Sequence, residues 1–258
     1  MTSHDTNLRD TDRDWEAIAK DNPYWGVLSV DAYKGKQLDE AAERAFFQSG
    51  KQFIDDTIAF IRKHINPSFS PKRSLDFGCG VGRLVLPMAR ISGAVVGIDV
   101  APSMVEICRS NLRAAGIENA TVILGDDQCN QIDGMFDFIN SYIVIQHIPP
   151  ERGYEIIAQL LSKLERGGVG SLQLTYAKHR KFLVHETAAA QYYRREGAML
   201  FDIGRRQHEP PAGTITMFDY DLNQIVAAVT RIAGSPVLLL PTEDDDHLGT
   251  HFIFQRAR

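Results

Sequence analysis

The chain has 258 residues, of which 44% are hydrophobic, enough to bury the core of one large α/β domain. A formal net charge of −5 and a pI of about 5.9 exclude the dense basic surface that nucleic-acid binding requires. The apolar stretches are far shorter than the roughly 20 residues of a membrane-spanning helix. The polar N-terminus does not resemble an export signal, and three widely spaced cysteines indicate neither disulfides nor zinc. We expect a cytoplasmic protein whose partners are neither nucleic acids nor membranes.

Residues 1–70 are predicted to form an N-terminal lid with helices. Asp14 precedes Trp15 and Ile18 at the spacing of a short amphipathic helix, and a longer helical pattern runs from Leu38 to His64.

Between these two helices, Asn22 to Gly35 mixes aromatic residues with proline and glycine, which predicts a loop. Since such loops often fold over ligands, Tyr24 and Trp25 become candidates for contact with a bound molecule.

Residues 71–258 are predicted to form the main domain. From Ser74 onward, β-rich runs alternate with helical patterns, which indicates a parallel sheet with helices on both faces. The five expected parallel strands are Ser74–Phe77, Ala94–Asp99, Ala120–Leu124, Phe136–Tyr142 and Val169–Tyr176. After a helix from Asp221 to Ala233, strands at Pro236–Leu240 and Thr250–Gln255 close the sheet. The prediction is a doubly wound, seven-stranded, mostly parallel α/β sheet with a terminal antiparallel hairpin.

One stretch, from about residue 177 to residue 213, interrupts this alternation. It is rich in charged and aromatic residues, and its portion from Leu183 to Ile203 has a helical pattern. We therefore expect a helical insertion in the main domain.

The first predicted strand of the sheet ends in an acidic residue followed by alternating glycines, Asp76-Phe77-Gly78-Cys79-Gly80-Val81-Gly82. Glycines let a backbone turn sharply and approach a ligand closely, because a β-carbon would block both. The segment resembles motif I of class I, Rossmann-like, S-adenosylmethionine-dependent methyltransferases. The resemblance implies that S-adenosylmethionine is the cofactor, with a small-molecule or sugar O-methyltransferase of the bacterial type as the expected subgroup.

A nicotinamide dinucleotide site is the main alternative for a glycine loop. Its fingerprint places the third glycine one residue later than Gly82, where this chain has Arg83. Asp76 would also repel a pyrophosphate, whereas it suits the ammonium group of S-adenosylmethionine.

The second strand ends at Asp99, 23 residues after Asp76. An acid at this position can accept hydrogen bonds from both ribose hydroxyls of an adenosine, and Val100 and Met104 would then lie beside the adenine. The structural alternative for Asp99 is a helix N-cap, a role that Ser103 could fill equally well.

The third and fourth strands carry further polar residues at their ends. Asp126, or less readily Asp127, resembles the acid of the family's Gly-Asp motif, which accepts a hydrogen bond from the adenine amine; the alternative is a solvated turn. Asn140 and Ser141 lie near the carboxyl edge of the fourth strand, where ligands of open α/β sheets bind. The methionine end of the cofactor is expected there.

Transfer of a methyl group to a hydroxyl requires a base in addition to alignment with the sulfonium carbon. His147, just past the fourth strand, is the predicted base, although a lone histidine is often structural. An amine or carboxylate acceptor would need no such base. A protein that binds S-adenosylmethionine without catalysis remains an alternative of a different class.

The acceptor site is predicted from aromatic and polar residues of the lid and the insertion. Such a mixture suits a sugar or oligosaccharide, but it is equally typical of a dimer contact, which makes a homodimer an alternative. The candidate acceptor-binding residues are Tyr24, Trp25, Tyr142, Tyr176, His179 and Tyr193.

The acidic run from Glu243 to His247 could gather a divalent cation. Consecutive carboxylates point in different directions, and charge runs are usually solvated loops. We therefore predict no metal site.

Overall fold

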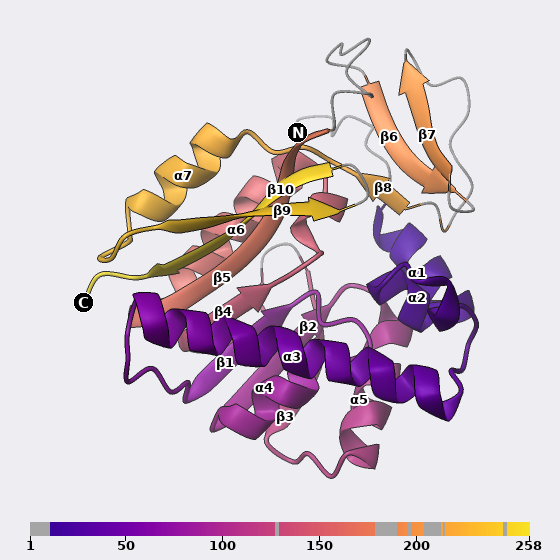
Figure 1. Cartoon of the computed structure of the whole chain (residues 1–258), viewed down its shortest axis with the longest axis horizontal. Coiled ribbons are helices and arrows are strands. Elements are labelled where there is room, and N and C mark those ends of the chain that lie inside the picture. Colours follow the sequence, from indigo (N-terminus) through magenta and orange to yellow (C-terminus); the bar gives the residue numbers. More distant parts are fainter. Residues whose placement is uncertain are drawn as a thin grey trace.

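A seven-stranded sheet forms the centre of the protein (Figure 1). The computed structural model describes residues 11–126, 129–178, 190–195, 198–203, 213, 215–244 and 247–258; for 190–195 and 198–203 it describes the backbone. The strands, in their order across the sheet, are β3 (Ala120–Leu124), β2 (Ala94–Asp99), β1 (Arg73–Phe77), β4 (Phe136–Ser141), β5 (Leu164–Lys178), β10 (His247–Gln255) and β9 (Leu238–Asp244).

The first five strands pair in parallel, and β10 pairs antiparallel with both β5 and β9. The predicted mostly parallel sheet with a terminal antiparallel hairpin is therefore confirmed. Because β2 and β4 lie on opposite sides of β1, the chain leaves a crevice at the carboxyl ends of β1 and β4.

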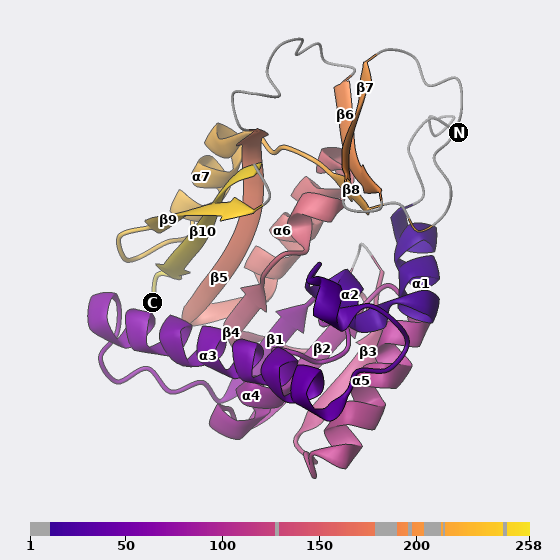
Figure 2. The same cartoon turned by 45° about the vertical axis from the view of Figure 1, so that its right-hand side comes forward.

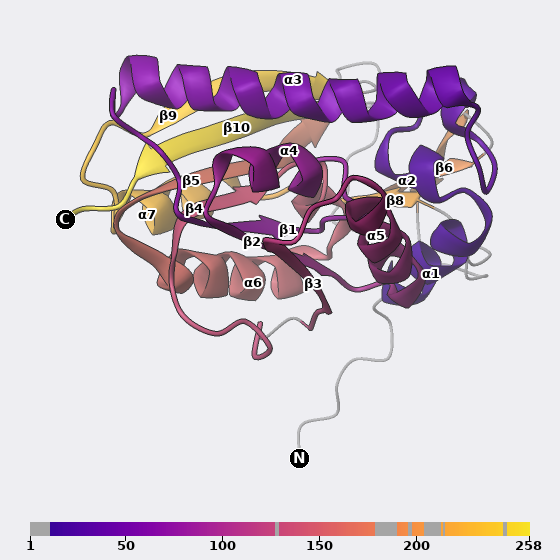
Figure 3. The same ribbon diagram turned by 90° about the horizontal axis from the view of Figure 1, so that it is seen from below.

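Helices cover both faces of the sheet (Figure 3). One face carries α3 (Glu40–His64), α4 (Val85–Ile91) and α5 (Pro102–Ala114), and the other carries α6 (Pro150–Lys163) and α7 (Leu222–Thr230). Two separate apolar clusters fill the spaces between the sheet and these two helix layers. None of the helices in the described ranges is long and apolar enough to span a membrane.

The long helix α3 begins at Glu40 because the side chain of Asp39 accepts a hydrogen bond of 2.8 Å from the Ala42 amide. Three basic residues occupy its last turn, where they complement the helix dipole. Gly50 of this helix faces the glycine loop, and a β-carbon at Gly50 would overlap the carbonyl group of Arg83. The helix therefore packs directly on the end of that loop.

The segment predicted as a loop, Asn22–Gly35, contains two short helices, α2 (Pro23–Val27) and a 3₁₀ turn (Asp31–Tyr33). Proline in the first turn of α2 is pre-organised for a helix. The prediction of a loop was wrong for these residues because their rings have a fixed packing partner. Both Tyr24 and Tyr33 contact Phe46 of α3 edge-on, each with ring centroids 5.2 Å apart.

The predicted helical insertion is also corrected. Within residues 177–213, the structure describes two strands, β6 (Ala190–Arg195) and β7 (Ala198–Ile203), which pair antiparallel. With β8 (Ile215–Met217) they form a second, three-stranded sheet beside the N-terminal helix α1 (Thr11–Asp21) (Figure 2). Residues with high strand propensity, including two consecutive tyrosines, outweigh the helical spacing read from the sequence.

Candidate active site

The glycine loop between β1 and α4 forms the floor of the site. Gly78, Gly80 and Gly82 have φ angles of 74°, 51° and 94°, in the left-handed region that side chains other than glycine rarely adopt. The loop is tied to the next strand, since the amides of Gly78 and Cys79 both donate to the carbonyl oxygen of Ile98.

Gly82 has a different role from its two neighbours. A β-carbon at this position would lie 2.8 Å from the sulfur of Cys108 and 3.0 Å from Leu86, so this third glycine lets α4 and α5 pack closely. Gly82 therefore affects the loop through the packing of these two helices.

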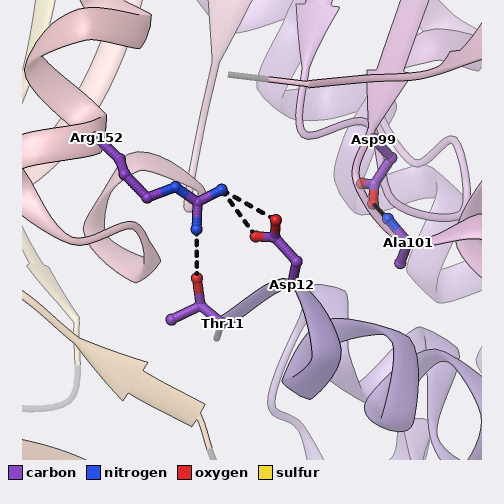
Figure 4. Close-up of polar contacts among 5 residues, drawn as sticks. All are labelled: Thr11, Asp12, Asp99, Ala101 and Arg152. Atoms are coloured by element: carbon purple, nitrogen blue, oxygen red, sulfur yellow. Dashed lines mark hydrogen bonds and ion pairs between the residues drawn. The ribbon is translucent and has the colours of Figure 1, made fainter. Parts of the chain in front are cut away.

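Asp99, at the end of β2, also holds the glycine loop in its conformation through hydrogen bonds. One carboxylate oxygen accepts a 2.8 Å hydrogen bond from the Gly80 amide. The other accepts a 2.9 Å bond from the Ala101 amide (Figure 4). Burial raises the pKa of Asp99, and these backbone donors act in the opposite direction. Ser103 does not cap α5, because Ala101 is the N-cap and Ser103 donates instead to Glu16.

A cavity opens above the carboxyl ends of β1, β2 and β4, at the crevice that the topology leaves. Eight residues predicted to bind cofactor or acceptor, or to act as base, line it: Gly78, Gly80, Asp99, Val100, Met104, Asp126, Tyr142 and His147. The structure thus brings together residues from the ends of four strands and from the turn that follows β4.

Asp126 lies in the cavity wall and also organises the turn after β3. Its carboxylate accepts bonds from the Asn130 amide, at 3.3 Å, and from the Gln131 side chain, at 2.9 Å. The alternative residue, Asp127, lies outside the described residues.

Three predicted cofactor residues are buried and lie behind the cavity wall. Asn140 donates to the carboxylate of Asp76 over 2.9 Å, and Ser141 donates to the carbonyl oxygen of Phe77 over 3.1 Å. Burial raises the pKa of Asp76 to about 7, although the hydrogen bond from Asn140 counteracts this. Asp137, near the start of β4, accepts bonds from the amides of Lys72 and Arg73 and so joins the beginnings of β1 and β4.

His147 lies in the cavity wall and is buried, with 7% of its surface exposed. Its Nδ1 is 3.0 Å from the carbonyl oxygen of Thr216 in β8. Since a carbonyl oxygen only accepts, Nδ1 carries a proton, and in the neutral form of the ring the lone pair is on Nε2. The indole of Trp15 meets the imidazole edge-on, with ring centroids 5.0 Å apart, and holds the ring in place.

The turn that leads to His147 is strained. Ile143 has a φ angle of 60°, which is unfavourable for a β-branched residue. Its amide donates over 2.9 Å to the side chain of Gln173, whose own amide donates to Gln146. Two buried glutamines therefore hold the turn in the conformation that places Ile143 and His147 in the wall of the cavity.

The N-terminal helix α1 closes one side of the cavity, and its contacts were not predicted. Arg152 of α6 donates to both carboxylate oxygens of Asp12, at 3.0 Å each, and to the hydroxyl of Thr11 (Figure 4). All three residues, with Trp15, line the cavity. The amphipathic pattern of α1 was readable in the sequence, but no local signal pointed from Asp12 to a partner 140 residues away.

The structure places the predicted acceptor residues in different surroundings. Tyr142 lines the cavity, whereas Tyr24 packs against Phe46 and Phe47, and half-buried Trp25 lies beneath the Lys34 ammonium group. The structure packs these two rings against α3 and α1 and does not place them in the described cavity wall. Tyr176 is half-buried and does not belong to the described cavity wall. His179 and the side chain of Tyr193 lie outside the described residues.

The acidic run Glu243–His247 lies where β9 passes into β10. Across the described residues, no three His, Cys, Asp or Glu side chains gather closely enough to hold a metal ion. Asp245 and Asp246 lie outside the description.

These residues fit S-adenosylmethionine. Gly78 and Gly80 have no side chain, so the loop backbone itself borders the cavity, and Asp99 places a carboxylate beside it. Met104 and Val100 give an apolar wall for adenine next to Asp126. A dinucleotide fits less well, because Asp76 places a carboxylate behind the loop where a pyrophosphate would lie, and Arg83 replaces the third glycine of the dinucleotide fingerprint.

The fold and the site define an α/β protein of the class I methyltransferase type. Residues 75–168 match the protein family described as a methyltransferase domain. This part of the chain is therefore a methyltransferase domain, and S-adenosylmethionine is the cofactor of its site.

Curated relatives and solved structures agree with this class. The chain is 27% identical over 162 residues to a ubiquinone biosynthesis O-methyltransferase of Xanthomonas euvesicatoria, covering 54% of this chain and 67% of that one. It is 31% identical over 100 residues to norajmaline N-methyltransferase of Rauvolfia serpentina, covering 38% of this chain and 34% of the relative. The curated relatives are thus matched over 21% to 67% of their length.

The structure of magnesium protoporphyrin IX methyltransferase from Synechocystis PCC 6803 with bound S-adenosylmethionine superposes with a TM-score of 0.60. The alignment covers 98% of this chain and all of the other, at 16% identity. At this identity the similarity shows the shared fold, and the methyl acceptor of this chain has to be argued from its own residues.

Proposed function

We propose that this methyltransferase transfers the methyl group to a hydroxyl oxygen of a small acceptor, with His147 as the base. The observation that carries the proposal is the orientation of the imidazole: its Nδ1 is bound to Thr216, and the ring faces the cavity. A base held in a single tautomer beside the acceptor is what hydroxyl transfer requires and what transfer to a neutral amine does not.

When bound, S-adenosylmethionine supplies a methyl group activated by a positive sulfonium. In the proposed step the acceptor oxygen forms a bond to the methyl carbon, while the bond between carbon and sulfur breaks and its electron pair stays on sulfur. The hydroxyl proton passes to Nε2 of His147, and the imidazolium is stabilised by its Nδ1–H bond to the Thr216 carbonyl oxygen. Trp15 and the α1 helix exclude water from this side of the cavity.

The walls around His147 indicate the acceptor class. Trp15, which contacts His147 edge-on, and Val144 and Ile148 of the same cavity wall are apolar, and Tyr142 adds a second aromatic ring. Two aromatic rings suit either the C–H face of a sugar, as proposed from the sequence, or a hydroxylated aromatic ring. The apolar surroundings favour the hydroxylated aromatic compound, because a sugar would leave several hydroxyls unpaired.

A methyl-transfer screen tests this proposal. The full chain is incubated with S-adenosylmethionine labelled on its methyl group and with three acceptor sets: phenols and catechols, simple sugars, and primary or secondary amines. We expect O-methylated products from the first set, with sugars reacting more slowly. Products methylated only on nitrogen would contradict the proposal, as would cofactor binding without turnover of any hydroxyl compound.

A further inference from the structure

The segment that begins in β8 lies along the turn that carries His147. This turn is a 3₁₀ turn, Ile145–His147. The carbonyl oxygen of Thr216 lies 3.0 Å from Nδ1 of the imidazole. Two residues further along the segment, the amide of Phe218 donates to the carbonyl oxygen of Gln146 over 2.7 Å. The segment thus holds the turn at alternate residues, and a tyrosine comes next in this series.

That tyrosine, Tyr220, contacts the turn through its hydroxyl group. The hydroxyl donates to the carbonyl oxygen of Ile145 over 3.0 Å and to that of Ile148 over 2.8 Å, and so shares its proton between them. These two carbonyl groups lie on either side of His147 in the chain. Tyr220 is 2% exposed, and burial raises its pKa, so the hydroxyl keeps its proton and remains a donor.

The surroundings of Tyr220 fix its backbone, its ring and its hydroxyl separately. Its amide donates to the carbonyl oxygen of Thr175 in β5 over 2.9 Å. Tyr154 of α6 packs edge-on against the ring, with centroids 5.4 Å apart. A β-carbon at Gly153 of α6 would overlap the hydroxyl oxygen, so the absence of a side chain there makes room for the hydroxyl at the turn. Tyr220 therefore gives the turn a rigid support.

We propose that Tyr220 is a positioning residue for His147: its hydroxyl fixes the turn so that Nδ1 meets the Thr216 carbonyl oxygen and Nε2 takes the acceptor proton. The inference rests on the proposed function, and it names the group that holds the base in place. A misplacement of about 1 Å can cost roughly a hundredfold in rate, so anchors on both sides of the base matter to turnover. Tyr220 acts through His147, since it is buried and does not belong to the described cavity wall.

Nuclear magnetic resonance of the full chain with ¹⁵N-labelled histidine tests this proposal without any acceptor. The His147 signals are assigned by their absence in His147→Ala. In wild type the neutral ring should be one tautomer, with the proton on Nδ1, as the Thr216 contact requires. In Tyr220→Phe, which keeps the ring and removes the hydroxyl, this tautomer should lose population to the form protonated on Nε2. An unchanged His147 spectrum in Tyr220→Phe would overturn the proposal.

Turnover gives a second test, measured with the phenol or catechol that wild type methylates fastest. Tyr220→Phe should lower kcat by roughly 10- to 100-fold, while the dissociation constant of S-adenosylhomocysteine changes less than about twofold. In a His147→Ala background the same substitution should cost less than about twofold, because the group that it positions is already absent. Equal losses in both backgrounds would overturn the proposal, since Tyr220 would then act on the fold as a whole.

Two further variants separate the hydroxyl contact from general packing. Tyr154→Phe removes a hydroxyl that accepts from the Asp221 amide over 2.9 Å and leaves the turn untouched, so kcat should stay within about twofold of wild type. Gly153→Ala should reproduce the loss of Tyr220→Phe, because the added methyl group displaces the Tyr220 hydroxyl, and it decides the question if Tyr220→Phe does not fold. Full turnover in Gly153→Ala would overturn the proposal. Full turnover in His147→Ala would instead contradict the proposed function, and the tautomer comparison would still decide whether Tyr220 positions the ring.

Discussion

The cofactor half and the acceptor half of the cavity are built in different ways. The cofactor half comes from one stretch of chain, from Asp76 to Asp126, in which each strand end adds one group. The acceptor half joins segments that are far apart in sequence. His147 contacts Thr216, 69 residues away, and Gly213 donates to Asp14, 199 residues away.

Because of this difference, local sequence sets the conformation of the cofactor half, whereas distant contacts set that of the acceptor half. A loop that turns on glycines and is tied to its own neighbouring strand has a conformation set by local sequence. A wall made of α1, a 3₁₀ turn and β8 depends on packing between distant elements, and its shape changes whenever one of them shifts. Substitutions in the first half should therefore alter cofactor affinity, and substitutions in the second should alter turnover.

The largest expected effect is on turnover, and it comes from substituting His147 in the acceptor half. His147→Ala should lower turnover by roughly 100-fold or more with cofactor affinity nearly unchanged, because a base acts on the acceptor only in the transition state. Steady-state rates and calorimetry on the same preparation measure both quantities. His64→Ala, an exposed histidine of α3, is the control and should behave like wild type. Loss of cofactor affinity or of stability at an unchanged rate would make His147 structural.

The converse substitution lies in the cofactor half. Asp99→Ala should weaken cofactor binding by about 1–3 kcal/mol, since it removes the acceptor for the ribose hydroxyls and also releases the amides of Gly80 and Ala101. The rate at saturating cofactor should stay close to that of wild type. Asp133→Ala removes an exposed carboxylate as a matched control. An unchanged dissociation constant would show that Asp99 only caps the loop.

The charge of Asp76 gives the cofactor half a pH dependence. Its pKa of about 7 in the folded protein lies above its ordinary value of 3.8, so the free protein holds this proton at pH 6 and has lost it at pH 8. A cofactor ammonium favours the ionised carboxylate, so binding should be roughly tenfold weaker at pH 6 than at pH 8. Titrations of wild type and Asp76→Asn measure this, and the variant should lose the pH dependence. The same weakening in Asp76→Asn would assign the effect to another group.

The same raised pKa has a consequence for the unliganded protein. Because the folded state binds the proton more tightly than the unfolded chain, the stabilisation from Asp76 is complete below pH 4 and is lost as the pH rises through 7. Asp76→Asn should therefore lose less thermal stability than wild type between pH 5 and pH 8.

The smallest expected effect concerns the boundary between the halves. Arg152→Met removes the ion pair to Asp12, whose side chains are 25% and 40% exposed, so solvent screens much of its energy. Cofactor affinity should fall by roughly two- to fivefold through faster dissociation, since α1 closes the cavity less firmly. Stopped-flow dissociation rates measure this, with exposed Arg113→Met as the control. An unchanged dissociation rate would show that α1 does not retain the cofactor.

The sequence predicts the cofactor half well because its signals are local. The boundaries of β2 and β3 agree with prediction at both ends, and Asp99 and the glycines lie where the motif implies. Asn140 and Ser141 were placed near the correct edge, but strand alternation alone did not show that they face away from the cavity wall.

The sequence predicts less of the acceptor half, where tertiary contacts decide the outcome. Helical spacing in the insertion gave the wrong element for β6 and β7, although the pair Tyr192-Tyr193 and the apolar run that follows Gly197 in the sequence are typical of a hairpin. No local signal pointed to Tyr220, because its hydroxyl donates to carbonyl groups 72 and 75 residues away.

Calorimetric titration of the whole chain with S-adenosylhomocysteine and, in parallel, with NAD⁺ tests the central claim most directly. The geometry of Asp76, Asp99 and the glycine loop predicts a dissociation constant on the order of micromolar for S-adenosylhomocysteine and negligible heat for the dinucleotide. Tight binding of NAD⁺ with no binding of S-adenosylhomocysteine would contradict the account.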